Sequence, residues 1–267
     1  MLVGIGDNCI DCYLPPIDRT FVGGNVLNVI ANVAKRGGHA GYLGTVGDDP
    51  EGTAVLQALS GLGLDTSLVR VAPGRTGLTH IRLLGDEYDL VEETYGVSGQ
   101  FQLTAEAVSF LRSSAHLIHL ATTGPAEGLA GKLSDLGIPI SCDLGNQTRR
   151  LTEAQRTELV PHLSYVFLSR RADVPESSIR TVIDDIVSLG PTRVIVTRGR
   201  LGCTVHWEGR EFSQPSLVTD HIVDPLGAGD AFVGGMLHAL LEGQSPEQAA
   251  ELGSRWAADS CRHVGAW

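Results

Sequence analysis

The chain has 267 residues, with 20 Lys and Arg against 31 Asp and Glu, so its formal charge is −11. This acidic balance disfavours a general nucleic-acid binder and a polybasic membrane anchor. No apolar run reaches the roughly 20 residues of a membrane-spanning helix, and residues 1–16 lack the basic and apolar regions of a signal peptide. We therefore expect a soluble, cytoplasmic protein that buries its own hydrophobic core.

Short β-branched runs alternate with amphipathic helical segments along the chain, and no linker or repeat divides it. The expected strands are Leu2–Ile5, Ala40–Val46, Ala115–Leu120, Ile138–Cys142, Tyr165–Leu168 and Arg193–Thr197. The expected helices are Asn25–Arg36, Pro50–Leu62, Thr104–Arg112, Thr152–His162, Pro175–Leu189, Ala228–Glu242 and Pro246–His263. This alternation predicts βαβ units, a mostly parallel sheet and an α/β fold in a single domain over residues 1–267.

Two stretches interrupt the alternation because no helix separates their strands. Residues 9–22 are short and extended, and Gly77–Leu84 and Leu90–Tyr95 are two expected strands around a polar turn. We expect these stretches, at about 9–22 and 77–95, to form a small antiparallel flap beside the main sheet. Such a flap is typical of a lid over a site or of a contact between subunits.

The segment Asp224–Gly235 (DPLGAGDAFVGG) combines a glycine-rich turn with the start of a long helix. The first N–H groups of a helix have no intrahelical partner and lie at the positive end of the helix dipole, so the turn predicts an anion site without lysine. Asp230 stands inside this turn, either as a capping acid or as a base for a hydroxyl. A base beside an anion site fits phosphoryl transfer to an alcohol.

A glycine pair, Gly23 and Gly24, precedes another expected helix, and Asn28 lies in the first turn of that helix. Side chains of this turn can reach a polyhydroxylated ligand. However, Asn25 is also a good N-cap of an ordinary helix. The pattern alone leaves both interpretations open.

Cysteines and histidines suggest no metal centre. The five cysteines are scattered, and Cys9-x-x-Cys12 has no second pair to complete a metal site, so we expect reduced thiols. His116 and His119 lie three apart on an expected strand, where they point to opposite faces.

These segments together resemble the signatures of the PfkB/ribokinase family of sugar kinases. The first family signature is matched by Gly23, Gly24, Asn28 and Gly38, and it continues into Gly44–Gly52, which is similar to the family's GxVGxDxxG stretch. The second signature is matched by Asp224–Gly235. The resemblance spans essentially the whole chain, and two signatures in this order are highly specific.

Two further stretches are similar to family motifs, and one motif is missing. Thr197–Gly202 resembles the nucleotide-binding loop TxGxxG, and Asp143–Asn146 with Arg149 resembles DxNxR. The family's NxxE motif, which is tied to Mg²⁺ and phosphate, has Ser169 in place of Asn and Ala172 in place of Glu. The candidates to compensate are Asp173, Arg170 and Arg171, although the two arginines are equally explained as part of a solvated loop.

The resemblance implies a ribokinase-like three-layer sandwich with a mostly parallel central sheet and a small β-lid, and an enzyme that uses ATP with Mg²⁺. It implies that Asp230 is the catalytic base and that the anion hole is formed by Gly227, Ala228 and Gly229. Contacts with the sugar are implied for Asp11, Gly23, Gly24 and Asn28. Contacts on the nucleotide side are implied for Thr197, Gly199, Gly202, Ser169, Asn146 and Arg149. The lid of many relatives also forms a homodimer, so we expect one here.

The two ends of the chain suggest an acceptor. Gly6–Asp11 (GDNCID) and Gly265–Trp267 (GAW) are similar to the ends of the fructoselysine 6-kinase branch, which phosphorylates a glycated lysine. This resemblance implies transfer of the γ-phosphate of ATP to a primary hydroxyl of fructoselysine. An acidic lid residue, Glu92 or Glu93, would pair with the substrate amine; we take Glu92 as the candidate, although both are also explained as surface charges. The alternatives are another acceptor (fructose, ribose, a keto-deoxy sugar acid or a nucleoside) and a non-catalytic binding protein on the same scaffold.

Overall fold

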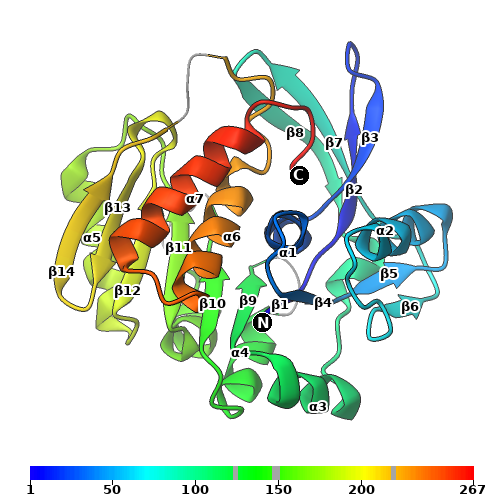
Figure 1. Cartoon of the computed structure of the whole chain (residues 1–267), viewed down its shortest axis with the longest axis horizontal. Helices are drawn as coiled ribbons and strands as arrows, with labels where there is room; N and C mark the ends of the chain where they lie inside the picture. Colours follow the sequence, from blue (N-terminus) through cyan, green and yellow to red (C-terminus); the bar gives the residue numbers. More distant parts are fainter. Residues whose placement is uncertain (123–125, 146–150, 218–220) are drawn as a thin grey trace.

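An eight-stranded sheet forms the centre of the computed structural model, which describes residues 1–122, 126–145, 151–217 and 221–267 (Figure 1). The strand order is β14-β13-β12-β11-β10-β9-β1-β4. The bounds are β1 Leu2–Ile5, β4 Ala40–Leu43, β9 Leu117–Ala121, β10 Ile140–Asp143, β11 Tyr165–Ser169, β12 Arg193–Thr197, β13 Cys203–Trp207 and β14 Arg210–Gln214. Only β13 and β14 are antiparallel to their neighbours, so the predicted mostly parallel sheet is confirmed.

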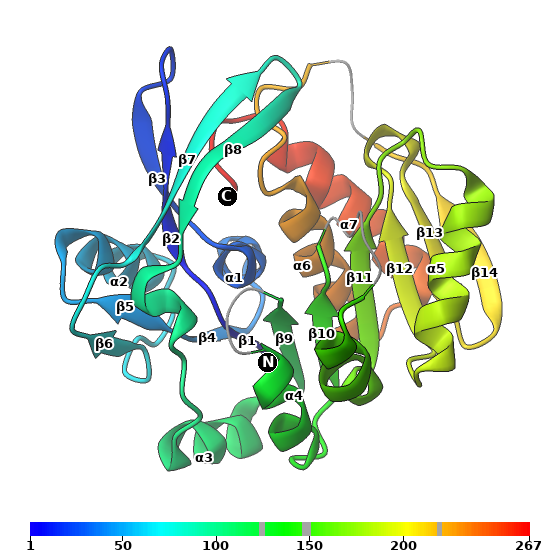
Figure 2. The same ribbon diagram turned by 180° about the vertical axis from the view of Figure 1, so that it is seen from behind.

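Helices cover both faces of this sheet and complete a three-layer α/β sandwich (Figures 1 and 2). One face carries α1 (Asn25–Lys35), α6 (Ala228–Leu241) and α7 (Pro246–Ser260), and the other carries α3 (Ala105–Ser114), α4 (Ala126–Ser134) and α5 (Glu176–Ser188). Alternate side chains of each strand serve the two cores: Leu2 and Phe167 pack on the α1 side, and Val3 and Leu168 on the α5 side. Within the described ranges, no helix is long and apolar enough to cross a bilayer.

A smaller sheet of order β3-β2-β7-β8 projects beyond the end of the main sheet toward which the strand arrows point (Figure 2). Its strands are β2 (Cys9–Tyr13), β3 (Arg19–Gly23), β7 (Gly77–Leu84) and β8 (Glu87–Thr94). The segments predicted as a flap therefore do pair. The prediction of a wholly antiparallel flap is wrong, however, because β2 and β7 run parallel.

Several elements differ from the sequence prediction for local reasons. The expected strand Ala40–Val46 is divided at Gly44, where a Cβ would lie 2.2 Å from the Tyr42 hydroxyl. The second half, β5 (Thr45–Gly47), pairs instead with β6 (Arg70–Ala72), beside α2 (Pro50–Gly61). The unpredicted hairpin β13–β14 turns at Glu208 and Gly209, both with positive φ, which is typical of a two-residue hairpin turn. Strands β6, β13 and β14 and helix α4 were not predicted.

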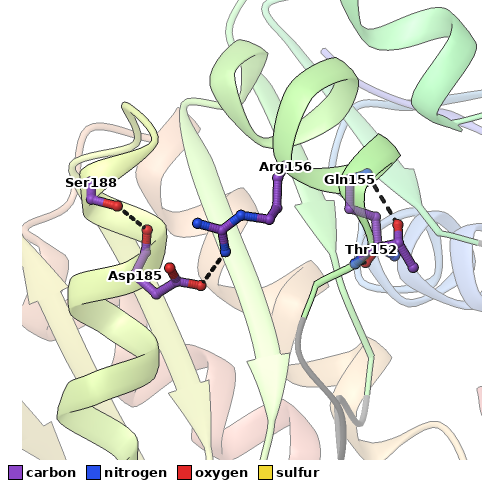
Figure 3. Close-up of polar contacts among 5 residues, drawn as sticks. All are labelled: Thr152, Gln155, Arg156, Asp185 and Ser188. Atoms are coloured by element: carbon purple, nitrogen blue, oxygen red, sulfur yellow. Dashed lines mark hydrogen bonds and ion pairs between the residues drawn. The ribbon is translucent and has the colours of Figure 1, made fainter.

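The helix predicted over Thr152–His162 is replaced by a π-helical turn at Gln155–Leu159 and a 3₁₀ turn at Val160–His162. Pro161 has no N–H to donate into a helix, so the α-helical ladder cannot continue through it. As Figure 3 shows, Thr152 and Gln155 bond each other's backbone N–H, at 3.0 and 3.1 Å, and Arg156 pairs with Asp185 of α5 at 2.6 Å. The Arg156–Asp185 pair holds the short turns against α5.

The close packing of α1 on β1 can be tested at Gly4. A Cβ at this position would lie 2.5 Å from Ile30 Cγ1 and 2.7 Å from Val26 Cγ1. We expect Gly4→Ala to lower the free energy of unfolding by about 1–3 kcal/mol, measured by urea denaturation, because the helix must shift. The control is Gly128→Ala in α4, where no atom lies within 4 Å of the added methyl and helix propensity favours Ala. Equal stabilities of the two variants would contradict this account.

Candidate active site

A cavity of about 310 Å³ lies between the carboxyl end of the main sheet and the small sheet. Its lining includes Asp143 and Ser169 at the ends of β10 and β11, Asn28 of α1, Asp230 of α6 and Asp11 of β2. Because the carboxyl ends of parallel strands meet at one edge, side chains far apart in the chain converge there. We call this space the Asp230 cavity.

Asp230 is half-buried in this cavity and bonded to the first helix. Asn28 Nδ2 donates to Asp230 Oδ2 at 2.8 Å. Burial raises the pKa of Asp230 well above its usual 3.8; the Asn28 hydrogen bond opposes this, and nearby carboxylates, Asp143 first, add to the rise. A carboxyl group with a raised pKa is a stronger proton acceptor once ionised. Asn28 Oδ1 is buried without a hydrogen-bond partner among the described residues, so it is free to accept a ligand hydroxyl.

The turn at the start of α6 presents backbone donors to the same space. Gly227, the N-cap, has φ 76°, and no side chain caps this helix. Within the described part of the chain, the N–H groups of Gly229 and Asp230 have no acceptor, and no atom would lie within 4 Å of a Cβ at Gly229. Free helix N–H groups therefore face open space beside a carboxylate, as an anion site requires. The Ala228 N–H, expected in the anion hole, instead donates to the Pro225 carbonyl at 3.2 Å.

Asp11 enters the cavity from β2, and Gly23 makes room for it. A Cβ at Gly23 would lie 2.0 Å from Asp11 Oδ2, so only glycine fits on the paired strand. Burial raises the pKa of Asp11 to about 7; a hydrogen bond from the Cys9 thiol lowers it, and the nearby Asp224 carboxylate raises it further. Gly23 thus serves the site by packing.

The opening GDN residues support α1. The Asp7 carboxylate accepts the N–H groups of the first two residues of α1, at 2.9 and 3.1 Å, and so caps that helix from a distant segment. Gly24, with φ 113°, has its Cα so close to Asn8 that a Cβ would lie 2.5 Å from Asn8 Cα. Asp7 and Gly24 also line the cavity. Their packing sets the position of Asn28.

The structure places Glu92 outside the cavity and Glu93 inside it. Glu92 lies 3.7 Å from His80, and 68% of its side chain is exposed. Glu93 lines the cavity, and its Oε2 accepts the hydroxyl of Tyr95 at 2.8 Å. The register of β7 and β8 shifts between His80 and Ile81, so a bulge reverses the alternation of side chains along β8. Reasoning from the sequence alone could not choose between the two glutamates, because this bulge is set by strand pairing.

Carboxylates dominate the wall of the Asp230 cavity. Those that line it are Asp7, Asp11, Glu93, Asp143 and Asp230, and its described lining contains no Arg, Lys or His. Tyr88 and Leu90 of β8 form an apolar side. Such a wall attracts a cationic group and repels an anionic one.

Asp143 and Tyr88 line the cavity, but the sequence assigned neither a contact with a ligand, although Asp143 begins the stretch similar to DxNxR. Asp143 was recognisable, because it ends a buried strand at the same sheet edge as Ser169 and Thr197. Tyr88 was not, because its orientation depends on the bulge in β8.

A second cavity of about 250 Å³, the Thr197 cavity, adjoins the first. It is lined by Thr197, Gly199, Gly202 and Ala228, by the hydroxyl side chains of Ser216 and Ser254, and by Phe232. Ser169 and Gly229 line both cavities, so the turn of α6 lies at their junction. The described lining is uncharged, which suits a planar, weakly polar group such as a nucleobase.

The residues that replace the NxxE motif begin at Ser169, at the end of β11. Ser169 Oγ lies 2.9 Å from Thr197 Oγ1, and Arg170 donates to the Ser169 carbonyl at 2.9 Å. Arg171 and Asp173 pair with each other at 3.2 Å on the exposed surface, outside the described lining of both cavities. Asn146 and Arg149 lie outside the described residues.

The chain belongs to the pfkB family of carbohydrate kinases, whose model matches residues 17–267. The Escherichia coli fructoselysine 6-kinase is 32% identical over all of this chain and 99% of its own length. Fructosamine kinase FrlD of Bacillus subtilis is 31% identical over all of this chain and 92% of its own. A cytidine kinase of Thermococcus kodakarensis is 30% identical over all of this chain and 98% of its own.

Solved structures establish the ribokinase-like fold. The structure of Arabidopsis thaliana ribokinase complexed with ribose and ATP has a TM-score of 0.84 at 22% identity and covers 99% of this chain and 93% of that one. A putative ribokinase II from E. coli in complex with ATP and Mg²⁺ has a TM-score of 0.81 at 19% identity and covers 99% and 94%. The predicted three-layer fold is confirmed.

The buried carboxyl of Asp11 gives a pH-dependent stability. Its folded pKa of about 7 exceeds the unfolded value of 3.8, so the folded state binds the proton more tightly. The stability that Asp11 contributes therefore falls as the pH rises from about 4 to about 7. We expect Asp11→Asn to be more stable than the parent at pH 8, by up to about 4 kcal/mol in urea unfolding, and this difference to shrink at pH 5. A pH-independent difference would contradict the buried charge.

Proposed function

We propose that this kinase transfers the γ-phosphate of ATP to a primary hydroxyl of a fructosamine, with fructoselysine as the acceptor and phosphorylation at its 6-position. ATP would occupy the Thr197 cavity and the acceptor the Asp230 cavity. The observation that carries the proposal is the turn at the junction of the two cavities, where Gly229 faces both and Asp230 is held by Asn28.

The proposed chemistry follows from these groups. Asp230 removes the proton of the acceptor hydroxyl, whose oxygen attacks the γ-phosphorus while the bond to the β-phosphate oxygen breaks. The free N–H groups of Gly229 and Asp230 stabilise the charge on the transferred phosphoryl group. Asn28 Oδ1 and Asp11 accept hydroxyl groups of the sugar and orient it.

The residues present fit a Mg²⁺ ion that enters with ATP. No group of three or more potential metal ligands occurs in the described ranges, but Mg²⁺ in kinases is held by one or two carboxylates together with the substrate phosphates. Asp143 provides such a carboxylate in the same cavity as Asp230. The ion would neutralise phosphate charge.

The acidic wall supports a cationic acceptor. A fructosamine carries a secondary ammonium, which Glu93 or Asp11 would pair with, and an alkyl chain, which Tyr88 and Leu90 would contact. The relatives at about 30% identity include both fructosamine kinases and a cytidine kinase, so similarity alone does not choose the acceptor. The charge of the cavity disfavours a keto-deoxy sugar acid.

The small sheet would act as a lid and as a dimer contact. Asp86, in the turn between β7 and β8, pairs at 2.8 Å with Arg200 of the loop between Gly199 and Gly202. The hairpin therefore bridges both cavities and could exclude water during transfer. Leu84 of β7 and Val91 of the edge strand β8 are about half exposed, which favours a homodimer through this sheet. The five free cysteines and the use of ATP fit a cytoplasmic enzyme.

Replacing Asp230 with Asn tests the base. The amide keeps the size of the side chain and cannot accept the proton, so we expect kcat to fall by about 10²–10⁴-fold. Coupled ADP release measures kcat, and a melting curve checks the fold. A variant within threefold of the parent would remove Asp230 from this role.

Acceptor choice is tested by ADP release with fructoselysine, other glycated amino acids, fructose, ribose and cytidine. We expect saturable turnover with the fructosamines, and we expect Glu93→Gln to raise KM for fructoselysine about tenfold or more, because a charge-assisted contact is lost. The matched control is Glu92→Gln, the same change on the neighbouring exposed residue. Turnover on a plain sugar or cytidine alone would reject the fructosamine. A KM unchanged by Glu93→Gln would reject Glu93 as the partner of the ammonium group.

A further inference from the structure

Asp224 is a buried carboxylate that three separate parts of the chain contact. It is 0% exposed and forms no ion pair within the described residues. Its Oδ1 accepts the N–H of Leu226 at 2.9 Å, and its Oδ2 accepts the N–H of Gly265 at 2.9 Å and the hydroxyl of Tyr13. Leu226 lies in the turn at the start of α6 (residues 225–230), which we call the catalytic turn. Gly265 follows α7, and Tyr13 lies on β2 of the small sheet. Because the buried Asp224 carboxylate needs these three donors, it fixes the positions of Leu226, Gly265 and Tyr13 relative to one another.

Residues Gly265 and Ala266 form a wedge behind the catalytic turn. A Cβ at Gly227 would lie 2.3 Å from Ala266 Cβ, so the turn packs directly on this segment. The Ala266 carbonyl accepts Asn32 Nδ2 at 3.1 Å, and the same amide group donates to the Asn28 carbonyl at 3.0 Å. The wedge therefore contacts the turn that contains the anion site and, through Asn32, the part of α1 that holds Asp230.

Tyr13 links this arrangement to the acceptor side. It lies two residues after Asp11 on β2, so both side chains point to the same face of the strand. Its ring packs edge-on against Phe21 at 5.5 Å, and Phe21 in turn lies against Gly265. Any displacement of β2 that moves Asp11 also moves the Tyr13 hydroxyl away from Asp224.

We propose that Tyr13 and Asp224 are positioning residues that hold the anion-binding turn in register with the sugar-binding strand. This inference rests on the proposed roles of Asp11 and of the turn at Gly227–Asp230. The hydroxyl of Tyr13 touches neither cavity: it acts through Asp224, which bonds the turn at Leu226. The position of β2, which places the acceptor, is thereby coupled to the position of the turn, which places the phosphoryl donor.

Tyr13→Phe removes the hydroxyl and leaves the ring against Phe21. We expect kcat to fall about tenfold with KM for ATP within twofold of the parent, because a misplaced turn weakens transition-state contacts more than nucleotide binding. We also expect hydrogen–deuterium exchange of the peptide 225–231 to rise about fivefold. The control is Thr104→Ala, which removes one capping hydrogen bond from α3, at the end of the molecule away from the small sheet (Figure 1). Melting temperatures compare the stability lost by the two variants.

Three results would overturn the proposal. These are a kcat for Tyr13→Phe equal to that of Thr104→Ala, an unchanged exchange of peptide 225–231, and a rise in exchange without a fall in kcat. If Tyr13→Phe does not fold, Ala266→Gly, which removes the methyl group behind Gly227, must give the same pair of effects. The parent enzyme on the acceptor panel tests the proposed function separately. The exchange measurement needs no acceptor, so it tests the link between β2 and the turn even if fructoselysine is not the substrate.

Discussion

The hydrogen bond from Asn28 to Asp230 depends on two helices that begin at the same edge of the sheet. It joins residues 202 positions apart, and it forms only because α1 and α6 pack side by side. Gly234 of α6 makes this possible: a Cβ there would lie 3.0 Å from the Val29 carbonyl of α1. The position of Asp230, the proposed proton acceptor, is thus a consequence of helix packing over the central sheet.

The carboxylates around this point divide into two groups by their partners. Asp7 and Asp224 are bonded to backbone N–H groups and hold helix α1 and the catalytic turn in place. Asp11 and Asp230 have fewer donors, and burial raises the pKa of each. Holding these carboxylates close together, with no cationic side chain in the described lining of the cavity, lowers the stability of the folded protein. An ammonium group or a metal ion that enters with the substrates would offset that repulsion, so the electrostatic deficit favours the loaded state.

The sequence predicted the parallel strands of the main sheet and every α-helix of the described structure except α4, because periodic hydrophobic patterns decide these features locally. It failed where a single residue interrupts a regular element: the expected strand is divided at Gly44, and Pro161 has no N–H to continue a helix. The turn at Gly227–Asp230 was predictable because glycines and a helix start define it. The choice of Glu93 over Glu92 was not, because the register shift in β8 arises from pairing with β7.

The absence of the NxxE motif leaves the hydrogen-bond donors of the site in place. The groups proposed to stabilise the phosphoryl charge are backbone N–H groups of the turn, which do not depend on side-chain identity. Gly227 must nevertheless remain glycine, because its φ of 76° and its contact with Ala266 both exclude a side chain. The Asn and Glu of the motif are replaced by Ser169 and Ala172, while Asp143 still supplies a carboxylate at the end of the adjacent strand. In this turn the structure thus restricts residue type most strongly at Gly227, where the backbone conformation itself admits no side chain.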